Sequence, residues 1–168
     1  SIPTPSPRRT IHTYGHYRNP QLGRIPPCFN QEEILIMPRI TRAALIQAST
    51  TTTDVNDLDA LKQSMIDKHI GLIEEAAHQG AKICCLQELF FGPYFCAEQN
   101  VEWYRMAERV PDGPTIKLMQ EQARKHGMIM IVPVYEEDLT GVYYNTAAVI
   151  DEHGKYLGKY RKHHLPHC

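Results

Sequence analysis

The sequence predicts an α/β fold, in which helices cover a sheet. Two short apolar runs, within residues 39–49 and at 83–86, are typical of strands that are buried in such a sheet. Between them, apolar side chains recur at helical spacing from Leu58 to Ala77. A strand, a long helix and a second strand form a crossover unit, so the two strands should be parallel.

Length and composition fit one globular domain. The chain has 168 residues, 42% of them hydrophobic and 22% charged, which is enough for a sizeable core and argues against disorder. The formal net charge of −1 gives no electrostatic reason to expect nucleic acid or an anionic membrane as a partner. No apolar run reaches the ~18 residues of a membrane-spanning helix, and nothing resembles a signal peptide, so a cytoplasmic protein is expected.

The five cysteines are odd in number and lack the spacing of a disulfide framework, which indicates reduced thiols. Cys84 and Cys85 are adjacent within a strand, so their side chains should point to opposite faces and act as small core residues.

Residues 1–38 differ from the rest and are interpreted as a proline-rich N-terminal arm. Seven of the twelve prolines lie here, no acidic residue precedes Glu32, and neither a helical nor a strand period persists. We expect the arm to pack on its own domain or on a neighbouring subunit.

The core is expected to begin with a strand centred on residues 43–46. After a polar loop, Asn56 or Asp57 supplies a helix cap, and the following helix of about six turns ends at Gly80. The next strand, 83–86, leads directly to Glu88.

The segment after this strand carries the first candidate catalytic residue. Glu88 is followed by Phe90, Phe91, Tyr94 and Phe95 around a Gly-Pro turn, so the carboxyl group should face an apolar wall. Desolvation there would raise its pKa towards neutrality, which suits a general base.

The remaining elements follow from turn and cap signals. Residues 98–108 predict a short helix, and VPDGP at 110–114 starts a longer one with Pro114 at its first position and Gly127 just past its end. Strands are expected at 128–135, where Pro133 requires a bulge or an edge, and at 143–150. The turn DEHG then closes a hairpin onto 155–161.

Three groups of residues compete for a chemical role. The first comprises Glu88, Glu136 and Lys162, each near a strand end, although spacing alone also fits three solvated charges. The second is the tail His163, His164, His167 and Cys168, which has metal-ligand residue types but no closed-site spacing. The third is Cys96 as a nucleophile, in an apolar run without a flanking base.

Several motifs, in order along residues 39–167, resemble the nitrilase or carbon–nitrogen hydrolase superfamily. They are CLQELFFGPYFC, VPDGPT, PVYE, YYNTAAVIDEHG and LGKYRKHHLPH. The resemblance is closest to the N-carbamoyl amidohydrolases, meaning the β-ureidopropionases and N-carbamoylputrescine amidases.

The resemblance implies a Glu-Lys-Cys triad on an α-β-β-α sandwich that pairs with a second subunit into four layers. Glu88 matches the general base and Lys162 the lysine, while Glu136 falls at a supporting glutamate that would hold Lys162 or bind the substrate amide. Tyr144 and Asn145 match a pair beside that site, and Phe91 and Tyr94 would line the substrate site. No metal or organic cofactor is implied, and the partners are a small ureido or amide substrate and further copies of the chain.

The nucleophilic cysteine of the family follows the lysine by a few tens of residues, and Cys168 lies too close to Lys162 to match it. Residues 39–168 are therefore expected to be an incomplete domain, a partial nitrilase-type α-β-β-α sandwich without the nucleophile-bearing part. The implied function is hydrolysis of a non-peptide C–N bond in an N-carbamoyl amine or β-amino acid, with release of ammonia and carbon dioxide. The alternative is a truncated, catalytically inactive paralogue that acts as a binding or assembly module.

Overall fold

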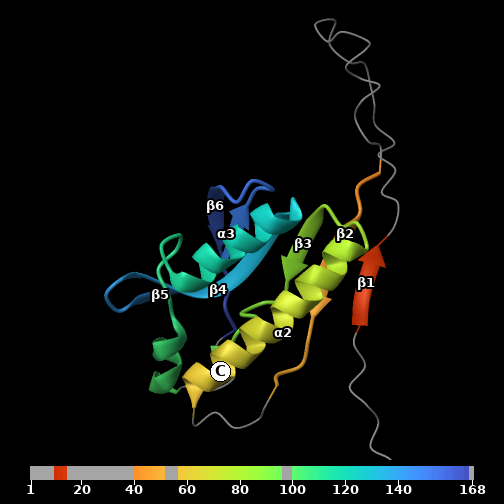
Figure 1. Ribbon diagram of the computed structural model, residues 1–168. Helices are drawn as coiled ribbons and strands as arrows, with labels where there is room; N and C mark the ends of the chain where they lie inside the picture. The colour runs from red at the N-terminus through yellow and green to blue at the C-terminus, as the bar shows by residue number, and fades with distance from the viewer. Residues whose placement is uncertain (1–9, 15–39, 52–56, 96–99, 167–168) are drawn as a thin grey trace, which may run out of the picture.

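The computed structural model describes residues 10–14, 40–51, 57–95 and 100–166, and their strands form one mixed sheet (Figure 1). The six strands lie side by side in chain order. They are β1 (Thr10–Tyr14), β2 (Ala43–Gln47), β3 (Ile83–Leu86), β4 (Ile129–Leu139), β5 (Val142–Ile150) and β6 (Tyr156–Arg161). The helices are α2 (Leu58–His78), the 3-10 helix η2 (Val101–Met106) and α3 (Pro114–His126).

The crossover unit forms as predicted. The Asp57 carboxylate caps α2 by accepting a hydrogen bond from the Ala60 backbone N–H at 2.9 Å. This 21-residue helix returns the chain, so that β3 pairs in parallel with β2. After η2 and α3, β4 adds in parallel on the other side of β3. The carboxyl ends of β2, β3 and β4 therefore point to the same edge of the sheet.

Helix α3 begins and ends at the predicted residues. Pro114 occupies its first position, and Gly127 ends it in the left-handed conformation with φ of +58°. Buried Glu108 supplies the missing cap at the start, because its carboxylate accepts hydrogen bonds from the Thr115 backbone N–H at 2.9 Å and hydroxyl at 2.6 Å. Lys62 of α2 pairs with the same carboxylate, which ties the two helices together.

Strands β4, β5 and β6 form an antiparallel meander. Pairing between β3 and β4 ends at Ile131, whereas Glu108 bridges β4 further along through Tyr135 and Glu137. Pro133 lies between these two contacts on the same side of β4, so its missing N–H costs no ladder bond. β4 is an inner strand of the sheet, and its bulge lies between Glu137 and Leu139, so the prediction of a bulge or an edge at Pro133 was wrong.

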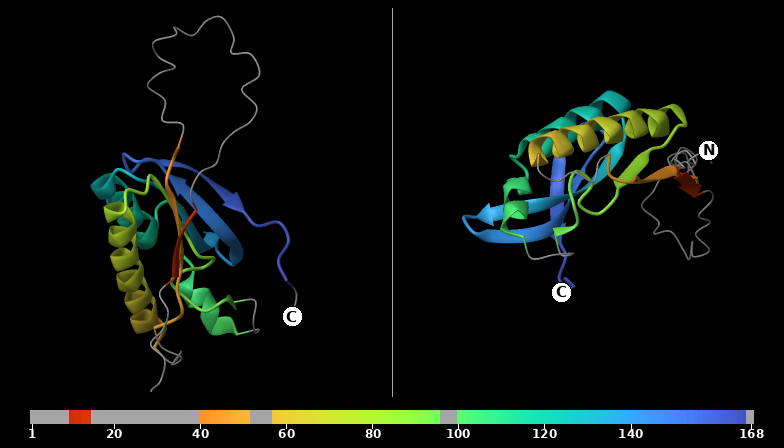
Figure 2. Two further views of the ribbon diagram at one scale, coloured as in Figure 1. Left: turned by 90° about the vertical axis from the view of Figure 1, so that its right-hand side faces the viewer. Right: turned by 90° about the horizontal axis from the view of Figure 1, so that it is seen from below.

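The two faces of the sheet differ. Both α2 and α3 lie on one face, as the right-hand view of Figure 2 shows. Side chains between this face and the helices form the core, with Cys84, Met130, Val132 and Ile150 fully buried. We call the opposite side the open face, since neither α2 nor α3 covers it; Leu45 is 47% exposed there and Tyr160 58%.

One strand was not predicted. β1 lies within the segment interpreted as an arm, and it pairs antiparallel with β2 at the edge of the sheet. Part of the arm therefore packs on its own domain, while the division at residues 38 and 39 stays a prediction. Among the described residues, no helix has the length and apolarity needed to cross a bilayer.

Candidate active site

Glu88 lies two residues beyond β3, where the chain leaves the sheet in a tight turn. Leu89 is buried and adopts a φ of +50°, an uncommon conformation for a residue with a side chain. Its turn lets Phe90 and Phe91 pack into the interior, both at most 2% exposed, while Glu88 stays accessible at the rim. The loop thus buries its aromatic side chains and leaves its one carboxylate facing outward.

The structure brings Glu88, Lys162 and Asn145 together. Glu88 Oε1 accepts hydrogen bonds from Lys162 Nζ at 2.7 Å and from Asn145 Nδ2 at 2.6 Å. Asn145 lies on β5, and Lys162 directly follows β6, so three separate segments supply the cluster. The side chains of Glu88 and Lys162 are 44% and 36% exposed, which leaves them open to a small molecule.

The contacts set the charge of both groups. Partial burial raises the pKa of Glu88, but the hydrogen bonds from Lys162 and Asn145 and the Lys162 charge outweigh it, so the pKa falls below its ordinary value. The hydrogen bond to Glu88 raises the pKa of Lys162, and Tyr94 adds to the increase. Glu88 is therefore a carboxylate and Lys162 an ammonium group at neutral pH.

The expectation that an apolar wall would raise the pKa of Glu88 was wrong. Phe90 and Phe91 turn inward behind Leu89, and Asn145 of β5 and Lys162 just after β6 donate to the carboxylate. Neither donor is visible in the sequence around Glu88, because both lie more than 50 residues further along the chain.

Glu136 lies on the other side of the sheet, under the helices. It is fully buried and accepts hydrogen bonds from Thr146 Oγ1 at 2.6 Å and from Arg161 Nε and Nη2 at 3.0 and 2.8 Å. Lys159 Nζ is its fourth donor. Burial raises the pKa of Glu136, but these donors prevail and lower it to about 2.

The predicted contact of Glu136 with Lys162 and the predicted place of Tyr144 beside the site are therefore corrected. Glu136 does not contact Lys162, because Lys159 and Arg161 occupy its carboxylate on the helix face. Tyr144 also faces this side, where its ring stacks on the Arg161 guanidinium at 3.8 Å. Successive side chains of a strand alternate between faces, so only Asn145 of the Tyr144-Asn145 pair can reach Glu88.

Lys159 and Arg161 were missed as site residues. They stand two apart in a strand that pairs with β5, so they share a face, and the buried acid Glu136 needs partners there. This alternation could have predicted that Lys159 and Arg161 pair with the same acid. The prediction also required knowing that Glu136 is buried, which the sequence does not show.

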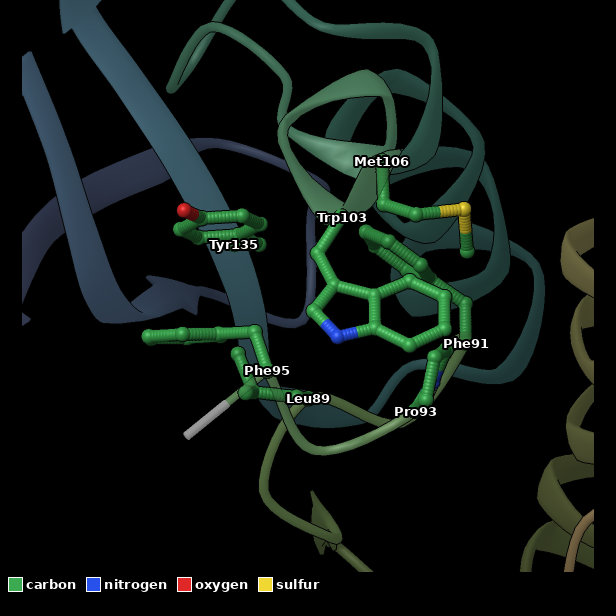
Figure 3. Close-up of a pocket in the computed structure, with 8 residues that line it drawn as sticks. Leu89, Phe91, Pro93, Phe95, Trp103, Met106 and Tyr135 are labelled. Atoms are coloured by element: carbon green, nitrogen blue, oxygen red, sulfur yellow. The ribbon is translucent and has the colours of Figure 1, made fainter. Parts of the chain in front are cut away.

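Aromatic side chains surround a small pocket at the end of the sheet, which is partly open to solvent and has a volume of about 10 Å³, enough for about one water molecule. Leu89 and Phe91 line it from the loop that begins at Glu88, and Figure 3 shows the Trp103 indole in the middle of the group. The other lining residues are Gly92, Pro93, Phe95, Met106 and Tyr135. Trp103 Nε1 is buried and has no hydrogen-bond partner among the described residues, which gives this apolar pocket one free donor.

Phe91 and Tyr94 have different surroundings. Phe91 lies between the pocket and Lys62, whose ammonium group is 4.5 Å from the ring centroid. Tyr94 is half-buried and stacks on Phe95, on the side of the loop that reaches Lys162. Tyr94 therefore adjoins the Glu88 cluster, whereas Phe91 lies in the interior, and the role of both in substrate binding stays a prediction.

The structure gives less support to the other two groups of candidate residues, the C-terminal histidines with Cys168 and the nucleophile candidate Cys96. Cys96, His167 and Cys168 lie outside the described residues. His163 contacts Tyr160, and the described part of the chain gathers no three His, Cys, Asp or Glu side chains that could hold a metal ion. Cys84 is buried in the core, and burial raises the pKa of its thiol to about 12, so it is inert at neutral pH.

Comparison with known proteins identifies the family. The family model for carbon-nitrogen hydrolases matches residues 42–167, which include Glu88, Asn145 and Lys162. The chain belongs to the carbon–nitrogen hydrolase family. The resemblance seen in the sequence motifs is thereby confirmed.

Curated relatives within this family include two kinds of carbamoyl amidohydrolase. A β-ureidopropionase from Arabidopsis thaliana is 36% identical over 132 residues, 77% of this chain and 32% of the relative. An N-carbamoylputrescine amidase from Solanum lycopersicum is 38% identical over 127 residues, 76% of this chain and 39% of the relative. The chain thus spans between about a third and two fifths of the length of these relatives.

Solved structures of the family share the fold. A carbon–nitrogen hydrolase from Helicobacter pylori G27 matches with a TM-score of 0.63 and 25% identity, over 74% of this chain and 40% of that one. An amidase from Nesterenkonia sp. matches with a TM-score of 0.55 and 25% identity, over 75% and 44% of the two chains. The mixed sheet and its helices therefore correspond to part of a nitrilase-superfamily amidase.

Proposed function

We propose that these residues form the acid–base half of an active site that hydrolyses a non-peptide C–N bond in an N-carbamoyl amine or N-carbamoyl-β-amino acid. One observation carries the proposal: Glu88 accepts hydrogen bonds from both Lys162 and Asn145 at an accessible rim of the sheet. Membership of the carbon–nitrogen hydrolase family and similarity to β-ureidopropionase and N-carbamoylputrescine amidase support the choice of reaction and substrate.

Glu88 would act as the general base. A ureido carbon is a poor electrophile, so the reaction needs a thiolate, and Glu88 takes the proton from the thiol. The lowered pKa of Glu88 keeps it in the carboxylate form that can accept this proton. Glu88 then passes the proton to the departing ammonia. The nucleophile is proposed to be a cysteine outside these 168 residues, since the relatives are more than twice as long.

Lys162 would stabilise the negative charge that develops on the ureido oxygen. Its hydrogen bond to Glu88 holds the ammonium group at the rim and raises its pKa, so the positive charge is fixed before the substrate arrives. Asn145 orients Glu88 through the second hydrogen bond. Water then attacks the carbamoyl-thioester, which releases carbon dioxide and the amine.

The aromatic pocket beside Glu88 would form an apolar wall for the part of the substrate that does not react. It begins at Leu89, next to Glu88, and combines apolar walls with the free Trp103 N–H. Phe91 lines this pocket, and Tyr94 interacts with Lys162.

The test uses a longer protein that extends these residues to the length of the relatives. We expect it to release ammonia from N-carbamoyl-β-alanine or N-carbamoylputrescine, and Glu88→Gln to abolish turnover with an unchanged circular dichroism spectrum. Turnover by Glu88→Gln near the wild-type rate would refute the role of Glu88. The 168-residue chain alone should be inactive; hydrolysis by it that disappears in Cys96→Ser would instead favour Cys96 as the nucleophile.

The open face favours a second candidate function, that of an assembly module. Leu45 and Tyr160 expose apolar surface there, as a half-sandwich would before a second layer covers it. A module without enzymatic activity would bind a full-length subunit through this face. Ammonia release by the extended protein would decide for the enzyme.

Compartment and oligomeric state belong to the same proposal. The five cysteines, odd in number and without the spacing of a disulfide framework, support a reducing cytoplasmic compartment. We expect a homo-oligomer that buries part of the open face.

A further inference from the structure

The two carboxylates of the site lie back to back across the sheet, and their donors come from neighbouring residues. Glu88, on the open side, binds Asn145 and Lys162. Glu136, on the helix side, binds Thr146 and Arg161, which are the adjacent residues on the same two strands. In each of these two adjacent pairs, one side chain therefore binds Glu88 and the other binds Glu136, and Lys159 is a further donor to Glu136.

This arrangement follows from strand geometry. Arg161 pairs with Thr146 in the register of β5 and β6, so their side chains share the helix face. The next ladder bond joins the Lys162 N–H to the Asn145 carbonyl at 2.9 Å. Lys162 directly follows β6, and this hydrogen bond holds its backbone just before the chain turns away at His163.

We propose that Glu136 is a positioning residue, which acts through Thr146 and Arg161 to hold Asn145 and Lys162 in place against Glu88. The proposal rests on the proposed function for its catalytic meaning, and on the described contacts for its geometry.

The hydrogen bonds and ion pairs of Glu136 are strong because the carboxylate is buried. The Glu136 side chain is 0% exposed, and its two oxygens receive four donors, two of them from the planar guanidinium of Arg161. Arg161 is further fixed by the Tyr144 ring and by Asp138 at 3.0 Å. By contrast, Lys162 is 36% exposed and carries a flexible side chain, which needs a fixed backbone to stay beside Glu88.

The test is an NMR titration of the Glu88 carboxyl group in the 168-residue chain. The Lys162→Gln variant lacks the ion pair with Glu88, so the pKa of Glu88 should rise in this variant. This raised pKa is the reference value for the other variants. Arg161→Lys keeps the positive charge but loses the bidentate hydrogen bonding of the guanidinium group to Glu136. We expect Arg161→Lys and Glu136→Gln to shift the pKa of Glu88 upward, towards the value in Lys162→Gln.

The matched control is Glu74→Gln, which makes the same change in an exposed ion pair with Lys125 on the far side of α2 and α3. It should leave the pKa of Glu88 unchanged. If Glu136→Gln does not fold, because Lys159 and Arg161 lose their buried partner, Arg161→Lys decides. A folded Arg161→Lys variant with the wild-type pKa of Glu88 would overturn the proposal.

The readout needs no turnover, so the two proposals fail separately. If Arg161→Lys shifts the pKa of Glu88 while an extended protein releases no ammonia, the positioning role stands and the proposed hydrolase function is wrong. If ammonia is released and the pKa does not move, the hydrolase function stands and Glu136 is only structural.

Discussion

The two glutamates of the site, Glu88 and Glu136, differ in the number of hydrogen bonds that they accept and in their burial, and so have different roles. Glu88 has two donors and remains accessible, whereas Glu136 has four and is fully buried. A carboxylate with free lone pairs at a rim can exchange a proton with a substrate. One with saturated oxygens in the interior can only hold structure.

The acid stability of the protein should depend on Glu136. Its pKa is about 2 in the folded state against an ordinary value of 4.5, so between these values the unfolded chain binds more protons. Stability from Glu136 is therefore complete above about pH 4.5 and is lost as the pH falls towards 2. Urea unfolding across this range should show a falling free energy of unfolding in the wild type.

Glu136→Gln supplies the control for this titration, provided that it folds. Its unfolding free energy should be lower at pH 6 and should depend less on pH below 4.5. An unchanged pH dependence in Glu136→Gln would mean that other carboxylates cause the acid sensitivity.

The Glu88 pKa also depends on Asn145. Asn145→Asp would replace a donor by a second carboxylate against Glu88 Oε1, and like charges at this distance oppose ionisation. We expect the pKa of Glu88 to rise in NMR titrations. Asn145→Ser, which adds no charge, should raise it less, and a fall in Asn145→Asp would contradict the assigned hydrogen bond.

At the scale of elements, a glycine in α2 and a glycine just before α3 differ in the space that surrounds them. Gly71 lies exposed in the middle of α2, and a Cβ built there meets nothing within 4 Å. Gly113 precedes α3, and a Cβ there would lie 2.5 Å from the Arg109 carbonyl and 2.6 Å from Glu108 Oε2. The same substitution should therefore have opposite effects.

Gly71→Ala should stabilise the protein by about 0.5–1 kcal/mol, because alanine restricts the unfolded chain and favours helix. Gly113→Ala should destabilise it by about 1–3 kcal/mol, because the methyl group displaces the Glu108 cap of α3. Chemical unfolding of the two variants measures both values. Equal effects of the two substitutions would show that Glu108 does not hold the start of α3.

The whole molecule is asymmetric, with helices on one face of the sheet and apolar side chains exposed on the other. Exposed apolar surface of this kind drives association. We expect the 168-residue chain to self-associate through the open face with increasing concentration, measured by analytical ultracentrifugation.

Leu45→Lys should weaken this association by placing a charge on the open face, where Leu45 is 47% exposed. Leu139→Lys is the matched control, because Leu139 is 65% exposed at the turn between β4 and β5, away from that face. Equal association of the two variants would exclude the open face as the contact.

The sequence by itself determined the helices and strands of the core and the family. Caps such as Asp57, Pro114 and Gly127 and the apolar periods act locally, so they are readable from neighbouring residues. The motifs around Glu88 and Lys162 likewise identified the two candidate residues. Strand β1 was not predictable, because its pairing with β2 depends on an exposed sheet edge and not on its own pattern.

Only the tertiary structure decided which charges meet. Glu88 and Lys162 are 74 residues apart, and Glu136 is closer to Lys162 in sequence than Glu88 is. Strand pairing nevertheless places Lys162 with Glu88 on one face and Arg161 with Glu136 on the other. The physical reason is the two-residue period of a strand: neighbouring side chains emerge on opposite sides, and the register across the sheet selects their partners.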